Sequence, residues 1–352
     1  MSEADFAYLN ARVRAVAADL LPAGFYEQVR VAEGIEPLVD ALLASAYAPL
    51  LREELAAERG LPAIERAVRR RVSGMIAHVH EVAPEEARAL LDIQFRFWDA
   101  ANVLAVIRGV AAHAEQEEVL RGMLPAGSLS EPRLAALAAE PGLAELADTL
   151  TTLDIPFAAA LRGRLRGDSP RADVAGLEAA VNDALFRWAR SRLGPRNNNE
   201  EIVLAMLRLQ IDVANVAAAL DAARHRERGD PIEDRPPMPG GRLGTGLPRE
   251  MASSARLMDS LALLAGTYFA PGVERGVRSA GGGGNLSVIV RFLEAVVVVA
   301  GCRLYHGDPL SVAVPLGFLW RTYNELVNLR VLARGKAYRV SPEAIGEELI
   351  VA

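Results

Sequence analysis

The sequence is short of several residue types, and each shortage excludes a class of protein. Cys302 is the only cysteine, so the chain cannot form an internal disulfide, and this thiol has no partner at metal-ligand spacing. Lys336 is the only lysine, and all other basic side chains except the histidines are arginines. A net charge of -6 and a pI near 5.6 leave no basic field over the whole chain. Nucleic acid is therefore not an expected partner.

Long hydrophobic runs are also missing. The N-terminus is acidic and leads into no apolar stretch, which argues against a signal peptide. The most apolar stretch, Phe292 to Cys302, is short and contains Glu294, whereas a membrane-spanning helix needs about 20 apolar residues. We therefore expect a soluble protein in a reducing compartment that meets a membrane only through its partners.

Residues suited to catalysis or cofactor binding are scarce as well. His78 and His80 lack a further ligand at the spacing of a zinc site. The sequence has no Gly-x-Ser-x-Gly, no DDxxD-type acid cluster and no Cys/His pair at a useful spacing. The glycine pattern at 241–246 follows no strand and lacks the ending of a phosphate-binding loop. We expect no catalytic residue, no cofactor and no metal.

What the chain has in abundance is Ala and Leu, with only 5% aromatic residues. This composition favours helices over strands. Apolar residues recur at helical spacing in 38–51, 62–80, 85–109, 142–163, 173–193, 200–226, 287–304 and 310–335. Pro62 and Pro84 are typical of helix starts, and Ser341 followed by Pro342 is typical of a helix cap. The sequence predicts an all-α protein.

One pattern occurs three times. Asp99-Ala-Ala-Asn102 recurs as Asp212-Val-Ala-Asn215 and as Glu325-Leu-Val-Asn328, and successive asparagines are 113 residues apart. A glutamate after an apolar residue recurs at Glu65, Glu178 and Glu294, and a weaker landmark lies near Tyr47, Pro156 and Tyr268. The sequence therefore predicts three tandem helical-bundle repeats of about 113 residues.

We expect the repeats to span residues 1–117, 118–230 and 231–352. A Pro- and Gly-rich linker at 227–249 marks the start of the third. Three such bundles can close around a pseudo-threefold axis or stack in a line.

The repeated acid and asparagine have two interpretations. An Asn on an apolar helix face needs hydrogen-bond partners and so fixes the register of its neighbours, and an acid three residues earlier lies on the same face. In the first interpretation these residues belong to the core of each repeat, and in the second they face a partner near a common axis. The residues are Asp99, Asn102, Asp212, Asn215, Glu325 and Asn328.

Arginines concentrate in segments 66–71 and 162–171 of this acidic chain. The simplest interpretation is a solvated helix face, and the alternative is a surface for partners or anionic lipid headgroups. The candidates for partner-facing arginines are Arg69, Arg70, Arg71, Arg330 and Arg334.

The C-terminal part resembles a known family. The segment from Gly307 through Glu325 and Asn328 to Lys336, and on to Leu349, is similar to the C-terminal signature of the C subunit of archaeal and bacterial V-type (A-type) ATPases. The eukaryotic V-ATPase counterpart in this family is the d subunit. The start, 5–14, is similar to the N-terminus of the family, so the resemblance covers nearly the whole chain.

The resemblance implies a funnel of three helical domains around a pseudo-threefold axis. It also implies a non-catalytic rotor subunit, in one copy per complex, peripheral on the cytoplasmic side of the cell membrane. A protein of this kind holds the proteolipid rotor ring and receives the two-subunit central shaft. It transmits torque between them in ion transport and ATP synthesis or hydrolysis.

Two alternatives stay open. A helical-repeat scaffold or adaptor of an unrelated complex would have the same fold, but it would not hold a ring and a shaft at once. An all-α enzyme of the terpenoid-synthase kind would need a paired-acid metal motif on facing helices, which the sequence lacks.

Overall fold

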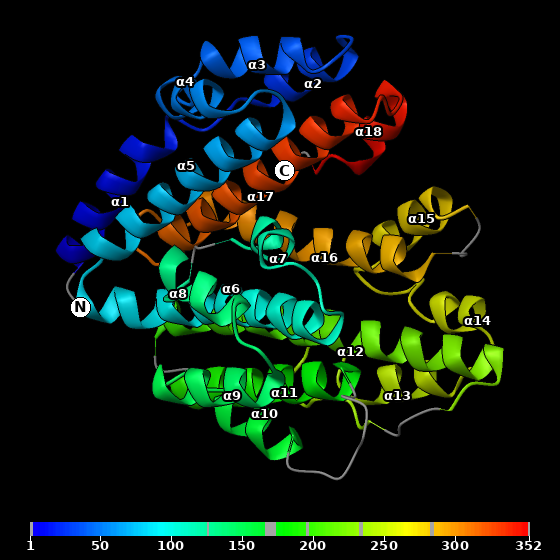
Figure 1. Ribbon diagram of the computed structural model, residues 1–352. Coiled ribbons are helices and arrows are strands. Elements are labelled where there is room, and N and C mark those ends of the chain that lie inside the picture. The colour runs from blue at the N-terminus through cyan, green and yellow to red at the C-terminus, as the bar shows by residue number, and fades with distance from the viewer. Residues whose placement is uncertain are drawn as a thin grey trace.

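The computed structural model describes residues 3–124, 127–165, 174–194, 197–231, 235–281 and 285–350. Every element of regular structure in these ranges is a helix, which confirms the predicted all-α class (Figure 1). Even the four successive valines at 296–299, a residue type that favours strands, lie within a helix.

Most of the helices fall into three groups of five, each with three short helices followed by two long ones; we call these groups units 1, 2 and 3. Unit 1 comprises α2 (Ala23–Val31), α3 (Glu36–Leu43), α4 (Ala48–Ala57), α5 (Leu61–Val82) and α6 (Glu85–Ala111). Unit 2 comprises α8 (Glu131–Ala138), α9 (Leu143–Thr152), α10 (Ala158–Leu165), α11 (Val174–Arg192) and α12 (Asn198–Arg228). Unit 3 comprises α13 (Gly246–Ser253), α14 (Leu257–Ala262), α15 (Ala270–Ser279), α16 (Leu286–Arg303) and α17 (Ala313–Ala337).

The remaining helices are α1 (Glu3–Ala17), α7 (Gln116–Gly122), the 3₁₀ helix η1 (Leu304–His306) and α18 (Pro342–Glu348). Predicted helix starts agree with these bounds. Pro62 lies in the first turn of α5, Pro84 directly precedes α6, and the Ser341 hydroxyl accepts a hydrogen bond from the N–H of Ala344 at 3.2 Å.

Two of the ranges with helical spacing do not form a single helix. The range 38–51 is divided between α3 and α4, and 142–163 between α9 and α10. Pro49 lies in the first turn of α4, and Pro156 lies in the break before α10. A proline lacks the N–H and disfavours helical backbone in the residue before it. The apolar spacing continues across each break because both halves face the same core. Unit 3 has the same division between α14 and α15, followed by Pro271.

Each unit packs against both of the others through its long helices. The second long helix of a unit lies on the first short helix and the first long helix of the next: α6 on α8 and α11, α12 on α13 and α16. The series is cyclic, because α17 lies on α2 and α5 of unit 1 (Figure 1). The core therefore runs from unit to unit, and buried α6 side chains such as Ile93 and Ile107 belong to two different apolar clusters.

Helix α12, rather than Phe292 to Cys302, is the helix in the described residues that is long and apolar enough to cross a bilayer. However, 56% of its most apolar window is buried inside the protein, and it carries the buried polar residues Asp212 and Asn215. These features are typical of a core helix, whose apolar faces are covered by neighbouring helices.

We predict that Gly317, where α17 meets η1, is required for stability. A Cβ at this position would lie 2.0 Å from the backbone nitrogen of Tyr305, so Gly317→Ala must displace backbone. We expect this substitution to lower the free energy of unfolding by about 1–3 kcal/mol, measured by urea denaturation.

Gly24→Ala is the matched control, because no atom lies within 4 Å of an added Cβ there. It should leave the stability unchanged or raise it by up to about 1 kcal/mol. Equal losses for the two variants would contradict the proposed close contact.

Candidate functional site

The three repeated asparagines hold the chain in the same way. Asn102 on α6 donates from Nδ2 to the carbonyl of Leu124 at 2.7 Å, and its Oδ1 accepts from the N–H of the same residue at 2.9 Å. Asn215 makes the same two hydrogen bonds to Met238, both at 2.8 Å. Asn328 makes them to Ile350, both at 2.9 Å. Each amide thus satisfies both backbone groups of one residue that follows 22 or 23 positions later, and fixes the path of the chain after the long helix.

The acid three residues before each asparagine binds the backbone that leads into the next unit. Asp99 accepts from the N–H groups of Ser128 at 3.1 Å and Leu129 at 3.0 Å, just before α8. In the same way Asp212 accepts from Arg242 at 2.7 Å and Leu243 at 3.2 Å, just before α13.

Glu325 makes the equivalent contact from unit 3 back to unit 1. Its Oε2 accepts from the N–H of Leu21 at 2.6 Å, although Leu21 is 304 residues away in the sequence. Its Oε1 accepts from the hydroxyl of Tyr47 at 2.6 Å. Leu21 directly precedes the entry to α2, so all three acids bind equivalent segments.

The third landmark of the sequence supplies a hydroxyl to two of these acids. Tyr47 donates to Glu325, and Tyr268 donates to Asp212. Burial, reinforced by the neighbouring carboxylate, raises the pKa of both phenols far above the ordinary value. Unit 2 has Pro156 near this position, and Asp99 instead accepts from the Ser128 hydroxyl at 2.7 Å.

Two glycines that sequence analysis missed make room for the shorter acids. A Cβ on Gly127 would lie 2.0 Å from Oδ1 of Asp99, and a Cβ on Gly241 would lie 2.0 Å from Oδ1 of Asp212. Each precedes by two residues the leucine whose N–H the acid accepts. At the junction of units 3 and 1, the residue two positions before Leu21 is Asp19 and not a glycine. The longer Glu325 side chain reaches the N–H of Leu21 there without needing a glycine. The two glycines are 114 residues apart, close to the 113-residue spacing of the asparagines, and this recurrence could have identified them from the sequence.

All six repeated residues are buried, with none more than 4% exposed. Burial raises the pKa of Asp99 and of Glu325, because a charged carboxylate loses its hydration there, and the hydrogen bonds that each accepts oppose this shift only in part. The structure therefore places these residues in the core between units, where they bind this chain's own backbone.

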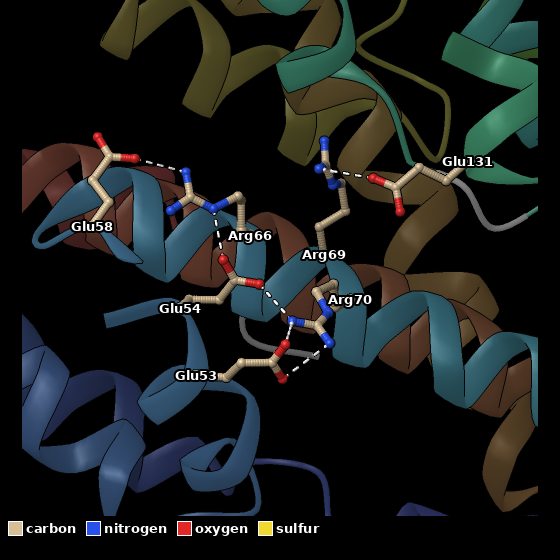
Figure 2. A network of polar contacts seen from close by, with 7 residues as sticks. All are labelled: Glu53, Glu54, Glu58, Arg66, Arg69, Arg70 and Glu131. Carbon is tan, nitrogen blue, oxygen red and sulfur yellow. Dashed lines mark hydrogen bonds and ion pairs between the residues drawn. The ribbon is translucent and has the colours of Figure 1, made fainter. Parts of the chain in front are cut away.

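The candidate arginines also contact groups of this chain. Arg70 pairs with Glu53 at 3.0 Å and with Glu54 at 2.7 Å, and Arg69 on α5 pairs with Glu131 of α8 at 3.0 Å (Figure 2). Although burial opposes it, hydrogen bonds from Arg66 and Arg70 hold the pKa of Glu54 below its ordinary value.

The other three candidates lie nearer to the core or between units. Arg71 pairs with Asp19 at 3.1 Å and lies over the ring of Tyr47. Burial lowers the pKa of Arg330, and Arg334 of α17 pairs with Glu65 of α5 at 2.6 Å. A partner-facing role for these arginines stays a prediction. In the second segment Arg162 pairs with Asp148, and Arg166 and Arg171 lie outside the described residues.

In the part of the chain that the structure describes, no group of three His, Cys, Asp or Glu side chains is placed to hold a metal ion. The polar residues that recur are instead used to join one helical unit to the next. The fold and these contacts define a class of protein: an all-helical protein of three units linked in a cycle.

Residues 9–348 match the ATP synthase (C/AC39) subunit family, and the chain belongs to it. The C subunit of the V-type ATP synthase of Thermus thermophilus is 30% identical over 353 residues, which cover 99% of this chain and 98% of the relative. The C subunit of the A-type ATP synthase of Pyrococcus horikoshii is 26% identical and is similar over 97% of this chain and 89% of its own length. The V-type counterpart in Deinococcus radiodurans is 23% identical, with 98% and 91% covered.

We predict that the three asparagines contribute similarly to stability. Replacing Asn102 or Asn215 by Ala leaves a backbone N–H and a carbonyl without their partner. Asn328→Ala leaves the N–H of Ile350 without its partner, whereas the carbonyl of Ile350 still accepts from Asn324. Each variant should lower the free energy of unfolding by about 1–3 kcal/mol. Denaturant unfolding measures this loss. Asn182→Ala, at a partly exposed position on α11, is the control and should be neutral. A stable variant among the three would show that its pair is dispensable.

The raised pKa of Glu325 predicts a pH dependence. The pKa of Glu325 in the folded protein lies above its value near 4.5 in the unfolded chain. The contribution of Glu325 to the free energy of unfolding is therefore full below the unfolded pKa, and it is lost as the pH rises through the folded pKa. Relative to Glu325→Gln, the natural protein should therefore lose free energy of unfolding as pH rises from about 4 to about 8. Urea titrations of both proteins across this range give the difference. A difference that does not change with pH would refute the raised pKa.

Proposed function

We propose that this chain is the non-catalytic central-stalk subunit of a V/A-type rotary ATPase or ATP synthase. In this role it couples the membrane proteolipid ring to the two-subunit central shaft during ion transport and ATP synthesis or hydrolysis. The observation that carries the proposal is the match of 9–348 to the family, with ATP synthase relatives that align over nearly their full length.

The linkage of the units supports a mechanical role. A part that transmits torque must resist shear between its domains, and here each pair of units shares an apolar core and a buried acid-to-backbone contact. Since the contacts are cyclic, we infer a funnel around a pseudo-threefold axis with units near 1–117, 118–230 and 231–352. The wide family match favours this role over an unrelated scaffold.

In this proposal the chain is peripheral on the cytoplasmic side of the cell membrane, in one copy per complex. It needs no cofactor and reaches the bilayer through the proteolipid ring. The work of the chain is then done by its shape and stiffness, whereas ATP and ion chemistry belong to other parts of the complex.

The proposal predicts the composition of the native complex. A tagged chain, purified from its own membranes in mild detergent, should bring down a proteolipid ring and a two-subunit shaft with ATPase activity. Quantitative mass spectrometry should give one copy of the chain per complex. Recovery of the chain alone, or with unrelated partners, would overturn the rotor role and favour the scaffold.

A further inference from the structure

Two of the three junctions between units share an ion pair. Arg108 on α6, six residues after Asn102, pairs with Glu178 of α11 at 2.6 Å. Arg334 on α17, six residues after Asn328, pairs with Glu65 of α5 at 2.6 Å. In both cases the second long helix of one unit supplies a guanidinium to the repeated glutamate of the next.

The third junction lacks this guanidinium. The residue six positions after Asn215 on α12 is Asp221, and the repeated glutamate of unit 3 is Glu294 on α16. An acid therefore stands where the other two junctions have an arginine. Among the residues that the structure describes, no basic side chain forms an ion pair with Glu294.

A cleft of about 620 Å³ lies at this junction. Asp221 and Glu294 both line it, together with Arg108 of unit 1 and Glu178 of unit 2. Since residues of all three units line the cleft, it lies where the units meet, near the proposed axis. The Asp221 side chain is 60% exposed, so the cleft is accessible from outside.

Four arginines and three acids line the cleft, and among the described residues Glu294 is the acid of this lining without an ion-pair partner. Arg108 and Arg291 are close enough to Glu294 to act on it electrostatically, but Arg108 is paired with Glu178 and Arg291 with Glu348. The ion-pair contact of Asp221 is His225, at 3.7 Å, which is charged only when protonated. Arg224 and Arg228 also line the cleft, one and two turns further along α12. An anion beside Glu294 would meet an unpaired carboxylate.

We propose that this cleft receives an arginine or lysine side chain of the central shaft, which takes the place of the missing guanidinium between units 2 and 3. The inference rests on the proposed function, because it requires a shaft. The same glutamate position binds a guanidinium at both other junctions, so its backbone setting suits one. The cleft supplies the entrance that a side chain from another protein needs.

This arrangement selects one orientation of the shaft. Three identical junctions would offer three equivalent seats around a pseudo-threefold axis. Because a single junction lacks its own guanidinium, the chain has one such binding site. The bound cation therefore fixes the rotational orientation of the shaft relative to this chain. The ion pair then contributes to specificity more than to total affinity, as charged contacts at interfaces commonly do.

Two substitutions test the inference through binding of the purified full-length chain to the purified two-subunit shaft. Asp221→Arg gives α12 the arginine of the other junctions, fills the cleft and pairs with Glu294. It should weaken binding about tenfold or more, while the melting temperature stays the same or rises. Glu294→Gln removes the charge without filling the cleft, and it should also weaken binding by about tenfold.

Glu250→Arg is the control, because it makes the same charge change at an exposed position on α13 outside the cleft. It should bind like the natural chain. If the natural chain binds the shaft and both cleft variants bind equally well, the inference is wrong and the proposed function stands. If Asp221→Arg alone weakens binding, the cleft is a contact but its occupant is not a cation, which also overturns the inference. If the natural chain does not bind the shaft, the proposed function fails, and the inference fails with it.

Discussion

The structure depends on a buried polar pair, an acid and an asparagine three residues apart, on the second long helix of each unit. A carboxylate or an amide inside an apolar core is costly unless its hydrogen bonds are made. Here the required partners are backbone groups of the segments that leave one unit and enter the next. Because the buried pair must make these hydrogen bonds, it fixes the path of the chain between units. That path places the first short helix of each unit on the second long helix of the preceding unit.

This constraint makes the units dependent on one another. Asp99 obtains its partners from the entrance to unit 2, Asp212 from the entrance to unit 3, and Glu325 from the entrance to unit 1. An isolated unit would keep a buried acid without partners, and would expose the apolar face that the next unit covers. The contact between Glu325 and Leu21 means that α17, the last helix of unit 3, completes the first unit. The three units are thus parts of one cooperative body.

The sequence was sufficient to predict the helical class. It also singled out the six repeated polar residues, because a polar residue at fixed spacing on an apolar helix is conspicuous, but it left open whether they belong to the core or face a partner. It was not sufficient to identify their partners. Gly127 and Gly241 resemble ordinary loop glycines until the carboxylate beside each is known, and Tyr47 reaches Glu325 only because the fold is cyclic. The breaks before α4 and α10 were missed because apolar spacing reports which face is buried, not whether the backbone is continuous.

Charged contacts of two kinds have different mechanical roles in this fold. Buried acids hold backbone in a fixed geometry, and solvent cannot replace them without opening the core. Exposed pairs such as Arg70 with Glu53 (Figure 2) exchange with water and contribute between about 0 and 1 kcal/mol each. The buried contacts and the shared apolar cores therefore contribute more to holding the units together than the exposed ion pairs do. The outer layer of ion pairs is correspondingly free to differ from one junction to the next, as Asp221 differs from Arg108 and Arg334, without loss of the common architecture. A chain of three similar units can in this way keep equivalent buried contacts at every junction and still present unequal surfaces.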